Sequence, residues 1–514
     1  MILGDFAVIN ARKQPKKDAI IFGDWRESFK EYNGRINSIA NALYDMGVKK
    51  GDKVAILSDI CPQYAEMYFA VAKGGFVIVP LNYRLAESEL SKIINDSEAN
   101  TLIVKKIYLE KILPIRKQLG KIKNYICIGG EAESFLDYET LVKKFPADEP
   151  NVKIHEDETL WLLYTSGTTG RAKGVELTHR GLCWAAIITT LAYDHLEPDD
   201  IGLLFAPPHA LGFSNTLMTH WYIGSTVVLL ERFEPLEVMK AIEQFKITSF
   251  WAVPTMLRMM IKHPDFFRYD LSSLRSIFYA GAPISEDLQK EIINAFGPIL
   301  TQGFGQTESG GPLTFISKRN HLRIEKRRSV GKPYPGVDLR IVDENDNDVP
   351  IGEAGEIVFR GDLAMKGYWN APEANVEVFK GGWVHTGDIG KLDEDGYLYL
   401  VDRKKDMIVS GGTNIFSKEV EEVINEHPAV AESAVIGVPD EHWGEAIMAI
   451  VILREGTTLT QDELLEFCKD KMGSYKRPKS VEFVTEFPRN PTGKILKPIL
   501  REKYRKGPGG RKES

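Results

Sequence analysis

One segment, Tyr164–Gly174, constrains the fold and the chemistry of this chain more than any other. It follows the apolar run 160–163, which predicts a strand, and it holds four serine or threonine hydroxyls, three glycines and one lysine. Glycines let backbone N–H groups approach an oxyanion closely, hydroxyls donate hydrogen bonds, and Lys173 adds a positive charge. This composition suits a polyphosphate, and the alternative is a simple turn. It is not a Walker loop, because Gly167 and Gly170 precede Lys173 without the G-x-x-x-x-G-K-[ST] spacing.

Helical and strand patterns alternate over residues 28–104 and again over 175–300. Ser28 and Glu31, for example, have capping-box spacing at the start of a helical face. Strands separated by helices imply parallel sheets with right-handed crossovers, and such sheets bind ligands at the carboxyl ends of their strands. Short β-rich segments between turns follow from 316 to 389, and a compact α+β unit begins near Asp402.

We therefore predict an α/β protein. Its large N-terminal part, 1–402, should contain two parallel-type α/β subdomains plus a small β subdomain. A small C-terminal α+β domain should cover 403–505, and 506–514 should form a disordered tail.

Composition narrows the class of protein. The 514 residues are too many for one core, and 43% hydrophobic with 27% charged residues is ordinary for a soluble globular protein. The net charge of −7 gives no general attraction to nucleic acid. The start of the chain lacks a signal-peptide pattern, and no apolar run reaches the roughly 18 residues of a membrane span. We expect a cytoplasmic enzyme, with peripheral membrane contact and a homodimer left open. The four cysteines are far apart and predict reduced, buried thiols: Cys61, Cys127, Cys183 and Cys468.

The glycine-rich segment also carries a resemblance. Residues 164–174 match the pattern [Y]-[ST]-[ST]-G-[ST]-[ST]-G-x-x-K-G throughout. The chain thus resembles the acyl-adenylate-forming enzymes, which include acyl-CoA synthetases, luciferases and peptide-synthetase adenylation domains, and the similarity runs from about Phe29 to Tyr504. The resemblance implies that 1–402 is the AMP-binding domain and 403–505 a mobile domain. It also implies that Thr165 is a Mg²⁺ ligand and that the loop contacts the β- and γ-phosphates of ATP through Thr165, Ser166, Gly167, Thr168, Thr169, Gly170 and Lys173.

Two further motifs would complete the nucleotide site. Residues 302–309 match the family's [YF]-G-x-[ST]-E pattern, which implies an adenine contact from Phe304, an α-phosphate contact from Thr307 and a Mg²⁺ carboxylate from Glu308. Residues 278–284 resemble the family's G-[GA]-A-P turn, in which the small Gly281 and Ala282 leave room for adenine.

The C-terminal motifs carry the remaining roles. Residues 382–388 and 401–406 contain matches to the family's T-G-D and [GD]-R-x-K-[DE], and the resemblance assigns Asp388 and Arg403 to the ribose hydroxyls and Lys405 to a hinge between domains. Residues 488–494 match P-x-x-x-x-G-K, which makes Lys494 the principal catalytic residue. The strip that would contact CoA is Ser410, Gly411 and Gly412.

The acid itself is the least constrained part of the prediction. The resemblance places His209 at the substrate carboxylate, although a packed loop histidine is the alternative. It places Phe213 at the acyl tunnel, where a plain core aromatic is equally compatible, and Phe278, Gly281 and Gln306 in the pocket wall. Some long-chain synthetases carry Lys where Val409 stands and Trp where Ile415 stands, and this chain lacks both.

The predicted reaction uses ATP, Mg²⁺ and CoA. A carboxylate is a poor electrophile, so it would first attack the α-phosphorus of ATP to form acyl-AMP and pyrophosphate, and a thiol would then displace AMP. We predict a carboxylate–CoA ligase for a medium- or long-chain fatty acid. The alternatives are an aryl or cinnamic acid, a carrier-protein thiol in place of free CoA, and a non-catalytic regulator. A regulator is expected to lack Lys494 or Glu308, and the chain has both.

Overall fold

The structure, a computed structural model, describes residues 1–165, 172–193, 196–282, 284–411, 413–440, 442–469, 471–489 and 495–505. The chain divides into two compact units. The first contains Met1–Leu339 and Phe359–Val384, and the second contains Arg340–Val358 and His385–Ser514.

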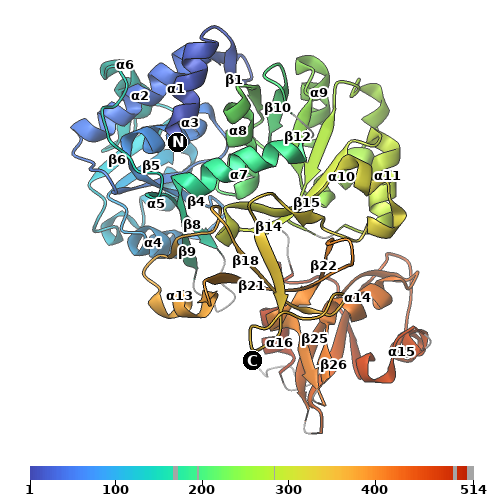
Figure 1. The fold of residues 1–514 in the computed structure, drawn as a ribbon. Coiled ribbons are helices and arrows are strands. Elements are labelled where there is room, and N and C mark those ends of the chain that lie inside the picture. Colours follow the sequence, from blue (N-terminus) through green and yellow to red (C-terminus); the bar gives the residue numbers. More distant parts are fainter. Residues whose placement is uncertain are drawn as a thin grey trace. The chain divides into compact units, whose positions relative to one another are not determined.

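An eight-stranded sheet forms one side of the first unit, in blue and teal in Figure 1. The strand order is β19-β9-β8-β4-β3-β5-β6-β7, and β4, β3, β5 and β6 run parallel. Helix α2 (Phe29–Asp45) begins with the predicted capping box of Ser28 and Glu31. The strands are β3 (Lys53–Leu57), β4 (Val77–Leu81), β5 (Thr101–Lys105), β6 (Asn124–Ile128), β7 (Leu136–Asp137), β8 (Thr159–Thr165), β9 (Lys173–Thr178) and β19 (Gly367–Tyr368), and further helices are α1 (Gly4–Lys13), α3 (Pro62–Gly74) and α4 (Glu87–Asp96).

A nine-stranded sheet forms the other side, in the order β16-β15-β14-β13-β12-β10-β11-β1-β2. Its central strands are parallel, and the chain's first strand, β1, joins them beside β11. The strands are β1 (Asp18–Phe22), β2 (Trp25–Ser28), β10 (Ile201–Leu204), β11 (Thr226–Leu229), β12 (Ser249–Ala252), β13 (Ser276–Tyr279), β14 (Leu300–Gln306), β15 (Gly311–Ile316) and β16 (Lys332–Pro333), and the helices include α7 (His179–Ala192), α8 (Leu211–Ile223), α9 (Pro235–Phe245), α10 (Pro254–Ile261) and α11 (Glu286–Phe296).

Helices α7 and α8 pack between the two sheets and share one apolar core with both (Figure 1). Trp221 of α8 stacks on Phe69 of α3 with ring centroids 4.3 Å apart, and it also meets Phe29 edge-on at 5.3 Å. Such aromatic pairs contribute about 0.5–1.5 kcal/mol each beyond the area they bury. This core fixes the first unit as one body and positions the carboxyl ends of its strands.

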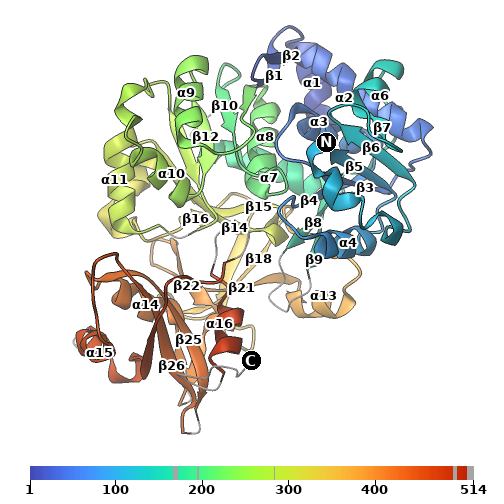
Figure 2. The ribbon, with the colours of Figure 1, turned by 180° about the vertical axis from the view of Figure 1, so that it is seen from behind.

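A third sheet contains β17 (Asp338–Val342), β18 (Gly355–Arg360), β20 (Phe379–Lys380), β21 (Trp383–Leu392) and β22 (Leu398–Arg403). The end of the chain, drawn in orange and red in Figure 2, folds as a further sheet with helices. Its central ladder pairs β25 with β26 over their whole length, and β27 runs parallel to β26. These elements are β23 (Ile408–Ser410), β24 (Thr413–Ile415), α14 (Ser417–Asn425), β25 (Val430–Asp440), β26 (Gly444–Leu453), α15 (Gln461–Lys469), β27 (Ser480–Phe483) and α16 (Lys497–Lys503).

The predicted α/β class, with two large subdomains and a small C-terminal part, is confirmed. The domain boundary at residue 402 stays a prediction, and the tail 506–514 lies outside the described residues. All four cysteines are buried free thiols, as expected. Within the described ranges, no helix is both long and apolar enough to cross a membrane.

Candidate active site

The predicted phosphate segment begins and ends on two paired strands. Strands β8 and β9 are antiparallel, and the last pair of their register joins Thr165 to Lys173. Both side chains therefore start from the same end of a rigid ladder. The loop residues Ser166, Gly167, Thr168, Thr169 and Gly170 lie outside the described residues.

The structure brings Lys173 and Glu308 to the same tyrosine, Tyr368. Lys173 Nζ lies 4.9 Å from the centre of the Tyr368 ring, and the Tyr368 hydroxyl donates a 2.8 Å hydrogen bond to Glu308 Oε1. Burial, and then the Glu308 charge, raise the pKa of Tyr368 above its ordinary value, so the hydroxyl keeps its proton and donates. The Lys173 ammonium, the Tyr368 ring and the Glu308 carboxylate thus form one cluster at the end of β9 where the predicted phosphate segment ends.

Tyr368 is held there by its backbone. Strand β19 pairs with β9, with Tyr368 opposite Val175. The Asn375 side chain accepts a 2.7 Å hydrogen bond from Tyr368 N–H and donates a 2.9 Å hydrogen bond to its carbonyl. Tyr368 was not predicted from the sequence, because a two-residue strand has no periodicity and its only local signal is the glycine before it.

Glu308 sits on a tight 3₁₀ turn, Thr307–Ser309, between β14 and β15. Ser309 Oγ accepts from Gln306 N–H at 3.1 Å and closes the turn. Gly310 follows at φ +61°, where a Cβ atom would lie 3.3 Å from the Leu363 carbonyl oxygen. Glu308 also accepts Met365 N–H through its own carbonyl at 2.8 Å, so the segment that leads to Tyr368 is fastened to this turn.

The predicted adenine wall lies at the ends of β13 and β14. Tyr279, the last residue of β13, pairs with Gln302 of β14, and its hydroxyl donates to Gln302 Oε1 at 2.9 Å. Phe278 is buried and packs over Gly303, where a Cβ atom would lie 2.7 Å from its ring. Gly281 has a φ of +83°, which favours glycine, and Ala282 and the half-buried Phe304 continue the two segments.

The predicted acyl residues differ in burial: Phe213 and Phe278 are buried, whereas His209 and Gln306 are half-buried. Burial, and then the Arg84 charge, lower the pKa of His209 to about 4, so its imidazole is neutral at pH 7. Its Nδ1 has no hydrogen-bond partner among the described residues, which leaves it available to a ligand. Phe213, on α8 rather than in a loop, is fully buried against Tyr64 and Tyr68, at 6.2 and 6.3 Å between ring centroids.

Two amide side chains, those of Gln306 and Asn215, each have one buried atom without a hydrogen-bond partner among the described residues. In the part of the chain that the structure describes, neither Gln306 Nε2 nor Asn215 Oδ1 makes a hydrogen bond, although both atoms are buried. Gln306 pairs with Gly311 across β14 and β15, and a Cβ atom on Gly311 would lie 3.4 Å from Asn215 Nδ2. Buried polar atoms without partners are rare in folded proteins, so this pair marks a place where a ligand's polar group fits.

In the second unit, Asp388 and Arg403 face each other across strands β21 and β22. Arg403 Nε lies 3.3 Å from Asp388 Oδ1, so the two residues predicted to bind the ribose are neighbours on one pair of strands. Lys405 follows in a short 3₁₀ turn, beside a buried Asp406 that accepts a 2.8 Å hydrogen bond from Arg501.

The predicted CoA strip begins at Ser410, the last residue of β23, and continues with Gly411. Gly411 has a φ of +57° and donates its N–H to the Trp443 carbonyl at 2.8 Å, and a Cβ atom here would lie 2.8 Å from the Trp443 ring. Trp443 is 45% exposed beside Ser410 and Gly411, and it was not predicted from the sequence. Gly412 and Lys494 lie outside the described residues.

Comparison with known proteins defines the class. The family model for AMP-binding enzymes matches residues 8–369, and the model for the AMP-binding enzyme C-terminal domain matches residues 419–494. The chain therefore belongs to the AMP-binding enzyme family, and it is an AMP-forming acid–thiol ligase that binds ATP.

Its relatives act on different acids. It is 38% identical to a feruloyl-CoA synthase of Amycolatopsis sp, over 98% of this chain and 99% of that protein. It is 36% identical to a long-chain-fatty-acid–CoA ligase of Mycobacterium tuberculosis, over 94% of each. Among solved structures it is similar to an anthranilate CoA ligase in complex with anthranoyl-AMP (TM-score 0.87, 30% identity, 98% of this chain and 97% of that one). It is also similar to ATP-bound MatB of Rhodopseudomonas palustris (TM-score 0.88, 28% identity, 98% and 99%).

Proposed function

We propose that the protein is an ATP-dependent carboxylate–CoA ligase that forms acyl-AMP and pyrophosphate, and then acyl-CoA and AMP. The observation that carries this proposal is the Lys173–Tyr368–Glu308 cluster at the end of the predicted phosphate segment. It combines a cation for phosphate oxygens with an oriented carboxylate for a metal, which are the parts that phosphoryl transfer needs.

The donor set suits Mg²⁺. This ion is usually held by one or two protein oxygens together with substrate phosphates and water. Glu308 supplies a carboxylate with one oxygen fixed by Tyr368, and Thr165 supplies a hydroxyl at the end of β8. When bound, Mg²⁺ would neutralise phosphate charge, while Lys173 contributes its own ammonium and Tyr368 keeps the carboxylate aligned.

The remaining roles follow the family resemblance. Asp388 and Arg403 would hold the ribose hydroxyls, and Lys494 would bridge the substrate carboxylate and the α-phosphate. Because Lys494 would occupy the space that a thiol needs, the C-terminal domain would rotate about Lys405 and present Ser410 and Gly411 to CoA. Peripheral membrane contact and a homodimer stay predictions.

For the acid, we favour an aryl or cinnamic acid with a hydrogen-bonding substituent. The unpartnered Gln306 Nε2 and Asn215 Oδ1 support this choice, because an unsubstituted alkyl chain would leave both buried groups unsatisfied. The feruloyl-CoA and anthranilate ligases among the similar proteins act on acids of this kind. A medium- or long-chain fatty acid is the second candidate, and the fully buried Phe213 and the fatty-acid relative favour it.

A pyrophosphate-release assay tests both the reaction and the acid. The substrates are 4-hydroxycinnamate, its unsubstituted partner cinnamate, octanoate and palmitate, each with and without CoA. We expect CoA-dependent thioester formation and a preference for 4-hydroxycinnamate over cinnamate that Gln306→Leu removes. Preference for octanoate or palmitate would favour the fatty acid, and release without a CoA thioester would favour a carrier protein. If none of the acids caused pyrophosphate release, the proposed ligase activity would be refuted.

A further inference from the structure

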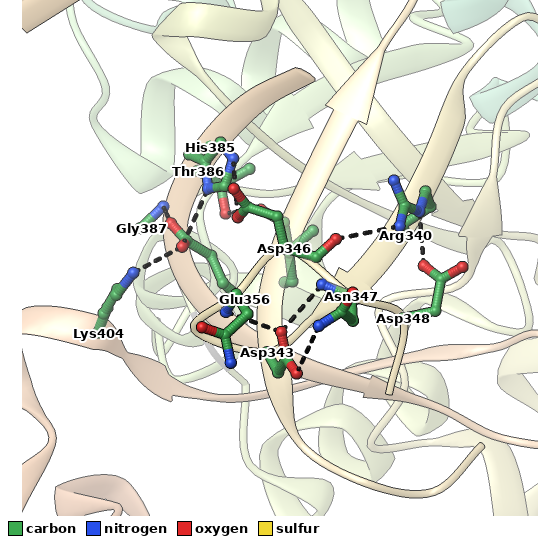
Figure 3. Close-up of polar contacts among 12 residues, drawn as sticks. Arg340, Asp343, Asp346, Asn347, Asp348, Glu356, His385, Thr386, Gly387 and Lys404 are labelled. Carbon is green, nitrogen blue, oxygen red and sulfur yellow. Dashed lines mark hydrogen bonds and ion pairs between the residues drawn. The ribbon is translucent and has the colours of Figure 1, made fainter. Parts of the chain in front are cut away.

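A single buried carboxylate in the second unit collects three hydrogen bonds. Glu356 of β18 is 7% exposed. Its Oε1 accepts Gly387 N–H at 3.1 Å, and its Oε2 lies 3.1 Å from His385 Nδ1 and 2.8 Å from Lys404 Nζ (Figure 3). Burial alone would raise the pKa of Glu356, but the hydrogen bonds from Lys404 and His385 outweigh burial and lower it, so the group is an anion at neutral pH.

These contacts hold the turn that carries Asp388. Gly387 has a φ of +68°, and its N–H is anchored on Glu356. The Thr386 hydroxyl donates to the Ile357 carbonyl at 2.7 Å and accepts Asp388 N–H at 3.1 Å. Hydrogen bonds therefore fix the segment Thr386–Asp388 to two consecutive residues of β18, Glu356 and Ile357.

Lys404 connects the same carboxylate to the next motif. It occupies the variable x position of [GD]-R-x-K-[DE], between the ribose residue Arg403 and the predicted hinge Lys405. Its side chain is half exposed, yet its ammonium reaches a carboxylate that is almost fully covered. Removing one partner from a buried ion pair leaves an uncompensated charge, so this contact ties Lys404 firmly to β18.

We propose that Glu356 is a positioning residue for nucleotide binding: its carboxylate aligns the Gly387–Asp388 turn for the ribose hydroxyls and, through Lys404, keeps the Arg403 segment in register with it. This inference rests on the proposed ribose role of Asp388. Glu356 itself does not touch the nucleotide, and it acts through the Gly387–Asp388 turn and Lys404.

The test compares ATP with 2′,3′-dideoxy-ATP, which offers Asp388 no hydroxyls. Glu356→Gln keeps the shape but cannot accept all three hydrogen bonds, because one of its two terminal atoms is a donor. We expect Glu356→Gln to lower kcat/KM for ATP about tenfold, mainly through KM, while kcat/KM for dideoxy-ATP changes little. Lys404→Met should reduce the preference for ATP in the same direction by a smaller factor.

Two further variants separate the possible outcomes. Asp388→Asn should itself abolish most of the preference for ATP, and if it does not, the proposed ribose site is wrong. Asp348→Asn breaks a more exposed ion pair with Arg340 in the same region (2.5 Å, Figure 3) and should keep the preference intact. If Asp388→Asn behaves as expected but Glu356→Gln weakens both nucleotides equally, Glu356 is merely structural and our inference fails. If Glu356→Gln does not fold, an unchanged preference in Lys404→Met overturns it.

Discussion

Replacing Tyr368 with phenylalanine removes one oxygen atom from the centre of the proposed phosphate site. The ring stays beneath Lys173, where the ammonium lies 4.9 Å from its centre, and only the 2.8 Å hydrogen bond to Glu308 is lost. Tyr368→Phe therefore tests how the orientation of the Glu308 carboxylate affects the reaction, without changing the aromatic ring near Lys173.

The size of the effect follows from the type of hydrogen bond. A hydrogen bond to a charged group contributes about 1.5–3 kcal/mol, which corresponds to roughly 10- to 150-fold in rate if all of it is used in the transition state. Without the hydroxyl, Glu308 keeps its place on the 3₁₀ turn, but its carboxylate can rotate. We expect kcat/KM for pyrophosphate release to fall at least about tenfold, and the Mg²⁺ concentration for half-maximal rate to rise.

The assay is acid-dependent pyrophosphate release over a Mg²⁺ titration. Tyr334→Phe is the matched control, because the Tyr334 hydroxyl is buried without a hydrogen-bond partner among the described residues, so its removal should leave both quantities unchanged. A Tyr368→Phe enzyme with the rate and the Mg²⁺ dependence of the unmodified protein would refute the reasoning.

Three other predictions concern separate parts of the chain. Lys494→Ala should abolish pyrophosphate release but largely spare thioester formation from supplied acyl-AMP. Equal loss of both half-reactions would contradict the proposed rotation of the C-terminal domain between the two steps. Trp443→Ala should raise KM for CoA and leave the adenylation rate unchanged, whereas a matching change in adenylation would show that Trp443 is not a CoA contact. Burial is the main cause that lowers the pKa of four histidines, to about 4 for His179, His209 and His220 and to about 3 for His321. The free energy of unfolding, measured by circular dichroism, should therefore fall as the pH falls from about 6.5 toward 4. Below pH 6.5 the unfolded chain binds protons that the folded chain excludes, which by pH 5 costs about 2 kcal/mol per histidine, and a flat stability between pH 7 and 5 would disprove it.

The sequence was most informative where local physics decides the structure. Helices with one apolar face, such as α4 and α9, and strands such as β3 occur within the two stretches for which an alternation of helices and strands was predicted. Helix α8 was not predicted, because Phe213–Trp221 are buried on every side and an apolar stripe with a helical period is absent from such a segment. Likewise, no local pattern predicts that β1 joins β11, about 200 residues away in the chain.

The site shows the same division. Motif spacing pointed to Lys173 and Glu308, and the structure places both against Tyr368. It also predicted that Asp388 and Arg403 serve one task, and they form a cross-strand pair. Tyr368, Trp443 and Glu356 were not predicted, because each acquires its partners only through long-range pairing. A glutamate in a β-strand, in particular, shows no sign in the sequence of being buried.

The strand that follows the phosphate segment has an electrostatic consequence. In many nucleotide-binding folds a glycine-rich loop opens directly into a helix, whose positive pole faces the phosphates. Here strand β9, Lys173–Thr178, follows the segment, so the described residue at its end, Lys173, opens a strand and not a helix. The positive charge that faces the phosphates should then come from side chains. The affinity of this enzyme for a triphosphate should therefore depend more strongly on the Lys173 ammonium than it would in a loop followed by a helix.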